Sequence, residues 1–122
     1  EDPRITGTVA AIEQRLVRDG FVHRYTTETL VDGLPAGEGA FILCTYWLAD
    51  VYVMQGRLAE AEAIFERVLA IRNDLGLLAE EFDPRLGRQL GNFPQAFSHI
   101  GLVNTARNLS ASGGTAEERP KA

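Results

Sequence analysis

The chain has 122 residues, of which 45% are hydrophobic, and it carries a formal net charge of -5. That length suits one domain, since domains commonly hold about 100 to 150 residues. The acidic balance argues against a nucleic-acid partner, because proteins that bind a phosphate backbone usually present a clustered basic face.

A first helix is predicted over residues 3–18. Asp2 can cap its N-terminus, and Pro3 suits a first helical turn. The turn signal of Asp19 and Gly20 ends the pattern. Apolar side chains recur in between at helical spacing, at Ile5, Val9, Ile12 and Leu16.

Residues 20–39 are interpreted as a long structured loop. The stretch GFVHRY can form a short extended piece, and Asp32 with Gly33 gives a turn signal.

The segment 40–55 is predicted to be a helix that is apolar nearly all round. Such a helix is buried on several sides, so elements outside a small two-layer protein are expected to cover it. Asp50 interrupts its apolar run, which is too short to span a bilayer comfortably, and no membrane partner is expected. Cys44 lies in this run as a small hydrophobe without an internal disulfide partner, which favours a reducing, cytoplasmic compartment.

A third helix is predicted over residues 58–73, and together with the preceding one it forms a helical hairpin. A loop is expected over 76–93, a last helix from Pro94 to Asn108, and a disordered tail over 110–122. The third helix has an apolar stripe at Leu58, Ala61, Phe65, Val68 and Leu69.

The hairpin also fits the spacing of one tetratricopeptide unit. Small and aromatic residues fall at the required positions, at Ala49, Tyr52, Gly56, Ala61 and Phe65. A second copy is missing, whereas such arrays need about three or more repeats to bury a continuous core. A tetratricopeptide-like protein-interaction module is therefore the alternative hypothesis.

Two motifs carry a resemblance to a known family. The stretches LLAEEFDP (77–84) and LGNFPQAFSH (90–99) combine unusual residue types in long order. With the flanking residues 2–108, they resemble the C-terminal part of bacterial glucoamylase-like and trehalase-like enzymes of glycoside hydrolase family fifteen.

The resemblance implies an all-α fold, with helical hairpins joined by long structured loops. The family is an (α/α)6 toroid, and residues 1–109 would supply about its last third. Neighbouring toroid helices would then explain the apolar character of residues 40–55.

Glu80 and Glu81 are the candidate reactive residues. Inverting hydrolysis of a glycoside needs an acid and a base about 6.5 to 9.5 Å apart, with a water molecule near the base. Adjacent side chains point in different directions and would seldom form that pair. The resemblance implies that Glu80 is the general base and that Glu81 contacts the sugar. The general acid has no counterpart in the chain, so the isolated chain is expected to be inactive.

Arg24, Tyr25 and Glu38 complete the expected glucose subsite by resemblance. A guanidinium offers several fixed donors, which suits vicinal sugar hydroxyls. Glu38 precedes a predicted helix, where a carboxylate often caps free N–H groups, and capping is its preferred interpretation although the loop borders the sugar site.

The expected partners are an α-linked glucoside, such as trehalose or a short maltooligosaccharide, and the N-terminal portion of the enzyme or a second copy. A partial toroid would leave uncovered the surface around Phe41, Tyr46, Trp47 and Val51. No cofactor or metal is expected, because His23 and His99 lack a third ligand at metal spacing and are interpreted as packing or hydrogen-bonding residues.

Overall fold

The computed structural model describes residues 2–26 and 38–112, and these are mostly helical. Its helices are α1 (Pro3–Leu16), α2 (Ile42–Met54), α3 (Leu58–Ala70) and α4 (Ala96–Ser112). Its short strands are β1 (Val17–Arg18), β2 (Phe21–Val22), β3 (Ala40–Phe41), β4 (Glu81–Asp83) and β5 (Arg88–Leu90). The expected helical class is confirmed, with small sheets added at the helix ends and in the loops. No helix within the described ranges is long and apolar enough to cross a membrane.

The first helix is shorter than expected because its last predicted residues form a strand. Val17 and Arg18 pair with β2 in an antiparallel hairpin. Asp19 and Gly20 have φ values of 53° and 80° and make the two-residue turn, a geometry that matches the twist of paired strands. Arg67 of α3 donates a hydrogen bond of 3.1 Å to the carbonyl oxygen of Gly20, which fixes the hairpin against the helices.

The other helix ends also differ from the sequence prediction by a few residues. Helix α3 ends at Ala70, earlier than expected, and α4 begins at Ala96. Helix α4 continues to Ser112, so the first residues assigned to the tail are helical. The predicted turn at Asp32 and Gly33 lies outside the described residues.

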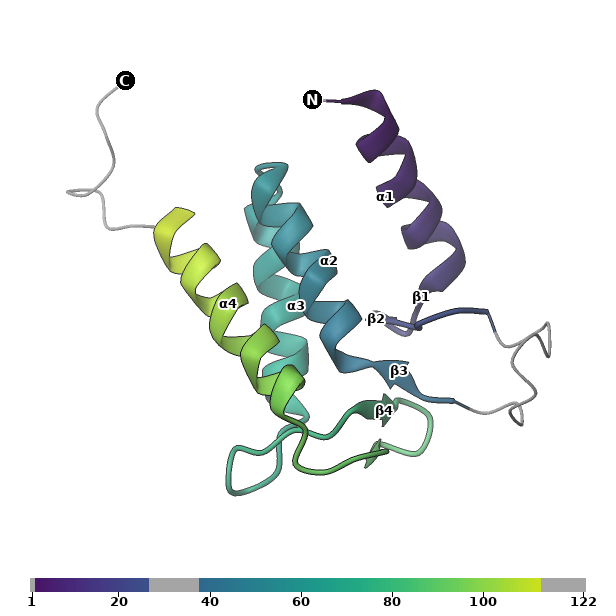
Figure 1. Cartoon of the computed structure of the whole chain (residues 1–122), viewed down its shortest axis with the longest axis vertical. Helices are drawn as coiled ribbons and strands as arrows, with labels where there is room; N and C mark the ends of the chain where they lie inside the picture. The colour runs from purple at the N-terminus through teal and green to yellow at the C-terminus, as the bar shows by residue number, and fades with distance from the viewer. Residues whose placement is uncertain (1, 27–37, 113–122) are drawn as a thin grey trace.

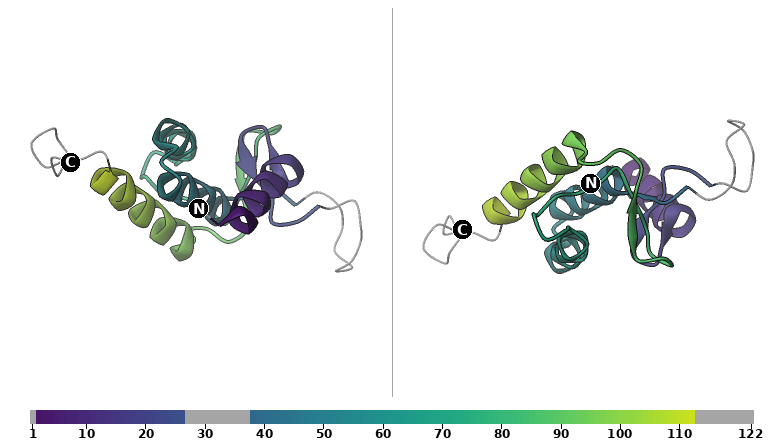
Figure 2. Two further views of the ribbon diagram at one scale, coloured as in Figure 1. Left: turned by 90° about the horizontal axis from the view of Figure 1, so that it is seen from above. Right: turned by 90° about the horizontal axis from the view of Figure 1, so that it is seen from below.

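Helix α2 lies at the centre of the molecule. It packs against α3 and α4 on one side, while α1 and the β1–β2 hairpin lie on the other (Figures 1 and 2). Phe41 and Tyr46 are buried in this arrangement, which corrects the expectation that they would lack neighbours. Trp47 remains 56% exposed, so part of α2 is uncovered as expected.

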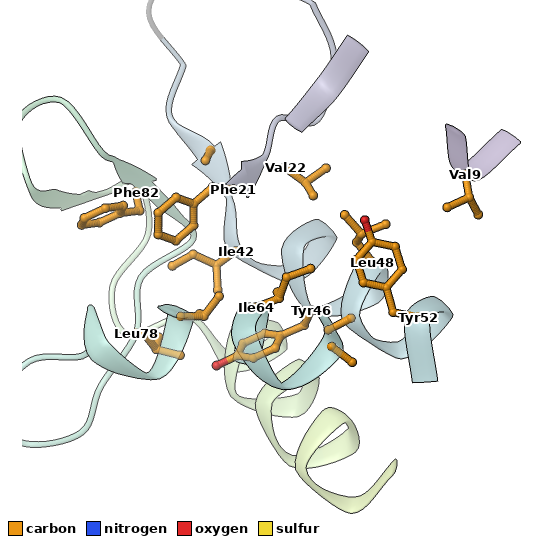
Figure 3. Packing of buried hydrophobic residues seen from close by; sticks show 14 residues of the cluster. Val9, Phe21, Val22, Ile42, Tyr46, Leu48, Tyr52, Ile64, Leu78 and Phe82 are labelled. Carbon is orange, nitrogen blue, oxygen red and sulfur yellow. The ribbon is translucent and has the colours of Figure 1, made fainter. Parts of the chain in front are cut away.

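The core is built where α2 meets α3, α4 and the strands. Ile42, Tyr46, Leu78 and Phe82 gather there in Figure 3, and the rings of Phe21 and Phe82 lie 5.2 Å apart. Burying such side chains contributes about 1.5 to 3 kcal/mol each.

Helix α4 approaches α2 closely because it carries a glycine at the contact. A Cβ atom at Gly101 would lie 3.0 Å from the side chain of Leu43 and 3.1 Å from the ring of Tyr46. A larger residue would therefore push α4 away from the core.

The second sheet has the order β3-β4-β5 and places Glu81 on its central strand. Glu81 is opposite Phe41 of β3 and Leu90 of β5. Asp83 closes the β4–β5 turn, since its Oδ1 accepts the N–H groups of Arg85 at 2.9 Å and Leu86 at 3.3 Å. The segment predicted as a loop over residues 76–93 thus contains a β-hairpin with ordered flanks.

Candidate active site

The extended segment that leads to the two acids is held by side chains from both flanks. Asn73 Oδ1 accepts the N–H of Leu77 at 2.7 Å. Gln89 Nε2 donates to the carbonyl oxygens of Ile71 at 3.2 Å and Leu77 at 3.1 Å, and its Oε1 accepts the N–H of Ala79. Backbone groups that would otherwise be unpaired in a half-buried loop are therefore satisfied.

Helix α4 fixes the same segment from the opposite side. Ser98 Oγ donates to the carbonyl oxygen of Ala79 at 2.7 Å. His99 Nε2 accepts the N–H of Leu78 at 3.3 Å, while Nδ1 lies 2.8 Å from the carbonyl oxygen of Gln95. These two contacts require the neutral tautomer with the proton on Nδ1. His99 is thus a hydrogen-bonding residue, as expected.

Glu80 stands at the end of this segment and is held by Asn92. Its N–H donates to the carbonyl oxygen of Asn92 at 3.0 Å, and its carbonyl oxygen accepts the N–H of Ile42 at 3.1 Å. Its carboxylate Oε2 accepts from the backbone N–H of Asn92 at 3.2 Å and from Asn92 Nδ2 at 2.9 Å. Oε1 has no hydrogen-bond partner among the described residues.

Glu81 has a different environment although it is the next residue. Its Oε2 accepts the N–H of Gly39 at 2.9 Å. Burial raises the pKa of the Glu81 carboxyl; the Gly39 N–H opposes this rise, and the nearby charges of Glu38 and Glu80 add to it. The two acids therefore divide as expected, one toward Asn92 and one toward the loop before β3.

Glu38 links Arg24 to Glu81, because its carboxylate interacts with both side chains. Its guanidinium donates a hydrogen bond to Glu38 Oε1 and lies 5.0 Å from the ring centre of Tyr25 and 5.2 Å from that of Phe41. The Arg24 side chain is 43% exposed, whereas that of Glu38 is 17% exposed. The guanidinium is thus held in one orientation and remains open to solvent on one side.

Glu38 does not cap a helix, so this interpretation is wrong. Helix α2 begins after Phe41, and no side chain caps its N-terminus. The β3 residues separate Glu38 from the helix, and its carboxylate pairs with Arg24 instead.

The structure therefore brings together four of the predicted site residues in one group. We call Arg24, Tyr25, Glu38 and Glu81 the arginine cluster. Glu80 adjoins it in the chain, but its carboxylate is anchored separately.

A cavity of about 490 Å³ lies next to the arginine cluster. Tyr25 and Glu38 line it, together with His23, Asp83 and Arg85. Burial lowers the pKa of His23, and the charge of Arg18 adds to this effect. Neither Glu80 nor Glu81 lines this cavity. No group of His, Cys, Asp or Glu within the described ranges is arranged to hold a metal ion.

Sequence reasoning missed the residues that hold the acids, above all Gln89, Asn92 and Ser98. All three lie in or beside the motif LGNFPQAFSH. Polar side chains in a turn do not by themselves reveal their partners, and only the folded arrangement shows which backbone groups they pair with.

Residues 1–107 match the family described as Glycosyl hydrolases family 15. The chain is similar to a trehalase of Mycolicibacterium smegmatis, with 48% identity over 104 residues that cover 85% of this chain and 16% of the relative. It is also similar to a trehalase of Mycobacterium tuberculosis, with 46% identity over 85% of this chain and 15% of the relative. A trehalase of Thermoplasma acidophilum is 41% identical over 88% of this chain and 18% of the relative. The chain thus spans less than a fifth of the length of each of these relatives, and no solved structure matches it.

Proposed function

The chain belongs to family 15 of the glycosyl hydrolases, and we propose that it is the C-terminal segment of an inverting α-glucosidic hydrolase. Residues 1–109 would carry the general base and part of the glucose subsite. The general acid would come from another part of the complete enzyme. The four helices of the present chain would be about a third of a toroid of twelve helices. Trehalose is the preferred substrate because the similar proteins are named trehalases. Short maltooligosaccharides are the second candidates.

The way in which Glu80 is held carries the proposal. A general base works when its carboxylate is fixed and one oxygen is open to the attacking water. Oε2 of Glu80 is bound by Asn92, and Oε1 has no partner among residues 2–26 and 38–112. We therefore propose that Oε1 accepts the proton of the attacking water.

The arginine cluster supports the assignment of a glucose subsite. Sugar sites combine aromatic faces with a few fixed polar groups. The guanidinium of Arg24 is oriented by Glu38 and lies over Tyr25 and Phe41, so its solvent-facing donors are preset for hydroxyl oxygens. Glu81 follows the proposed base directly in the chain, and its contact with the Gly39 N–H holds its carboxylate near Glu38 of the same cluster.

The test replaces each acid by its neutral isostere in the complete enzyme. Glu80→Gln keeps the shape of the side chain but cannot take a proton, so kcat on trehalose should fall by about a hundredfold to ten-thousandfold. Glu81→Gln should be much milder and should act mainly on KM, since its amide can still contact a hydroxyl. Glucose release and the anomer formed first are measured by NMR.

The difference in kcat between Glu80→Gln and Glu81→Gln is the control, because a general loss of order in the loop would lower the activity of both variants alike. Near-normal turnover of Glu80→Gln would show that the base lies elsewhere. Inverting hydrolysis of trehalose releases one β-glucose from the attacked sugar and one α-glucose as the leaving sugar, so initial release of α-glucose alone by the parent enzyme would contradict inversion.

A further inference from the structure

The structure assigns to Asn92 the role of a positioning residue for Glu80: it holds Oε2 and so presents Oε1 to the attacking water. This inference rests on the proposed role of Glu80 as general base. Asn92 supplies two donors to one carboxylate oxygen, from its backbone N–H at 3.2 Å and from Nδ2 at 2.9 Å.

The backbone geometry explains why the N–H of Asn92 can donate to the carboxylate of Glu80. Residues 80 and 92 lie side by side, and the N–H of Glu80 donates to the carbonyl oxygen of Asn92. The carbonyl oxygen of Glu80 accepts from the N–H of Ile42 instead, and within residues 2–26 and 38–112 no return bond from Asn92 to that oxygen is formed. The N–H of Asn92 therefore turns to the carboxylate.

Asn92 lies at the surface of the described structure. The residue is exposed, and within residues 2–26 and 38–112 its amide bonds only to Glu80. A glutamate side chain has several rotamers, and two hydrogen bonds to one oxygen select among them. Fixing a reacting group in advance lowers the entropy cost of reaching the reactive geometry.

Gly91 makes room for the same carboxylate. Its φ is 74°, and a Cβ atom there would lie 2.9 Å from Oε2 of Glu80 and 3.1 Å from its Cβ. Any side chain at position 91 would thus displace the carboxylate from Asn92. Gly87 has a similar φ of 62°, but nothing lies within 4 Å of its added Cβ. It is a matched control for backbone strain.

The experiment measures steady-state kinetics of the complete enzyme on trehalose. Asn92→Ala removes one charge-assisted hydrogen bond, so kcat should fall by about tenfold to a hundredfold with little change in KM. Asn92→Asp has the same shape but sets a second carboxylate against Oε2, and its kcat should fall further. Asn104→Ala removes another exposed asparagine, on α4, and should leave kcat unchanged.

The glycines give an independent comparison. Gly91→Ala and Gly87→Ala impose the same kind of strain at a positive φ, and both should lower thermal stability, Gly91→Ala by more because its Cβ also meets Glu80. Only Gly91→Ala should also lower kcat, by at least as much as Asn92→Ala, because only it moves the carboxylate.

A double variant separates positioning from a structural role. If Asn92 acts through Glu80, adding Asn92→Ala to Glu80→Gln should cause no further fall in kcat, because the group that it positions no longer takes a proton. If Asn92 merely supported the fold, the fold-reductions in kcat of the two single variants would multiply in the double variant.

The outcomes distinguish this inference from the proposed function. Full turnover of Glu80→Gln would overturn both. A large loss in Glu80→Gln together with unchanged kcat in Asn92→Ala, or with losses that multiply in the double variant, would overturn the role of Asn92 alone.

Discussion

Glu80 and Glu81 illustrate how two identical neighbours acquire different chemistry. Neighbouring side chains leave the backbone in different directions, and here one carboxylate reaches Asn92 while the other reaches Gly39. The sequence predicted that they would point in different directions, because that follows from their adjacency alone. Their partners could not be predicted, since Asn92 and Gly39 approach only in the folded chain.

The raised pKa of Glu81 leads to a prediction about pH and stability. A carboxyl whose pKa is higher in the folded protein than the ordinary 4.5 keeps its proton longer than in the unfolded chain. The two states are equally protonated at low pH. As pH rises above about 4.5, the unfolded state loses its proton first, and the folded state becomes relatively less stable.

Glu81→Gln should therefore raise the melting temperature of the complete enzyme near pH 7 and should have little effect near pH 4. The amide resembles the protonated acid and can still accept the N–H of Gly39. Thermal unfolding at several pH values measures this, with Glu62→Gln on the exposed face of α3 as the control. A Glu81→Gln enzyme that melts lower than the parent at pH 7 would contradict it.

At the scale of the elements, the helices were predictable and the strands were not. The apolar stripe of α3 and the all-round apolar character of α2 extend over several turns, which makes their period visible. Each strand has only two or three residues, too few to show alternation. Val17 and Arg18 continued the helical pattern of α1, and only pairing with β2 made them extended.

The hydrogen bonds that hold the segment before Glu80 were also beyond prediction. Gln89 reaches back to residues 71, 77 and 79, and Ser98 comes from a helix further along the chain. A polar side chain in a loop has many possible partners, and the tertiary arrangement selects among them.

Removing Gln89 should loosen this segment. Gln89→Ala leaves the carbonyl oxygen of Ile71 and the N–H of Ala79 without their partner, at a cost of about 1 to 3 kcal/mol for each group that water cannot reach. The carbonyl oxygen of Leu77 still accepts from the N–H of Asn73. We expect faster hydrogen exchange at the N–H of Ala79, whereas α3 should change little.

Hydrogen exchange measured by mass spectrometry on peptides covering residues 77–80 checks this effect. Gln14→Ala, on the exposed face of α1, is the matched control. Unchanged exchange at residues 77–80 in Gln89→Ala would mean that the contacts from Asn73, Asn92 and α4 hold the segment without Gln89.

At the scale of the whole molecule, the exposed apolar side chains matter most. Trp47 is 56% exposed on α2, and Ile100 and Val103 are 59% and 61% exposed one turn apart on α4. Apolar residues grouped on one helix face commonly mark an interface. The family resemblance anticipated such uncovered surface, but burial of Phe41 and Tyr46 by the chain's own helices depends on packing that the sequence pattern does not specify.

The chain on its own should therefore self-associate at micromolar concentration. Sedimentation velocity and binding of a dye that reports exposed apolar surface measure this. Replacing Ile100 and Val103 by Asp should reduce association, while Asn104→Asp adds a charge to the same helix without removing an apolar group. A parent chain that stays monomeric and binds no dye would contradict the prediction.

The pairing of β3 with β4 has a consequence for the order of events during synthesis. Ala40 pairs with Phe82, and the whole of α2 and α3 lies between them in the chain. A ribosome must therefore release both helices before β4 exists, and until then β3 has no partner within this sheet. Closing so long a loop is entropically costly, and a preformed helical hairpin lowers that cost by bringing its two ends close together. Glu81 on β4 and Glu80 beside it are thus fixed only after the helices that support them, so an error in the helical hairpin would first delay the positioning of these two carboxylates.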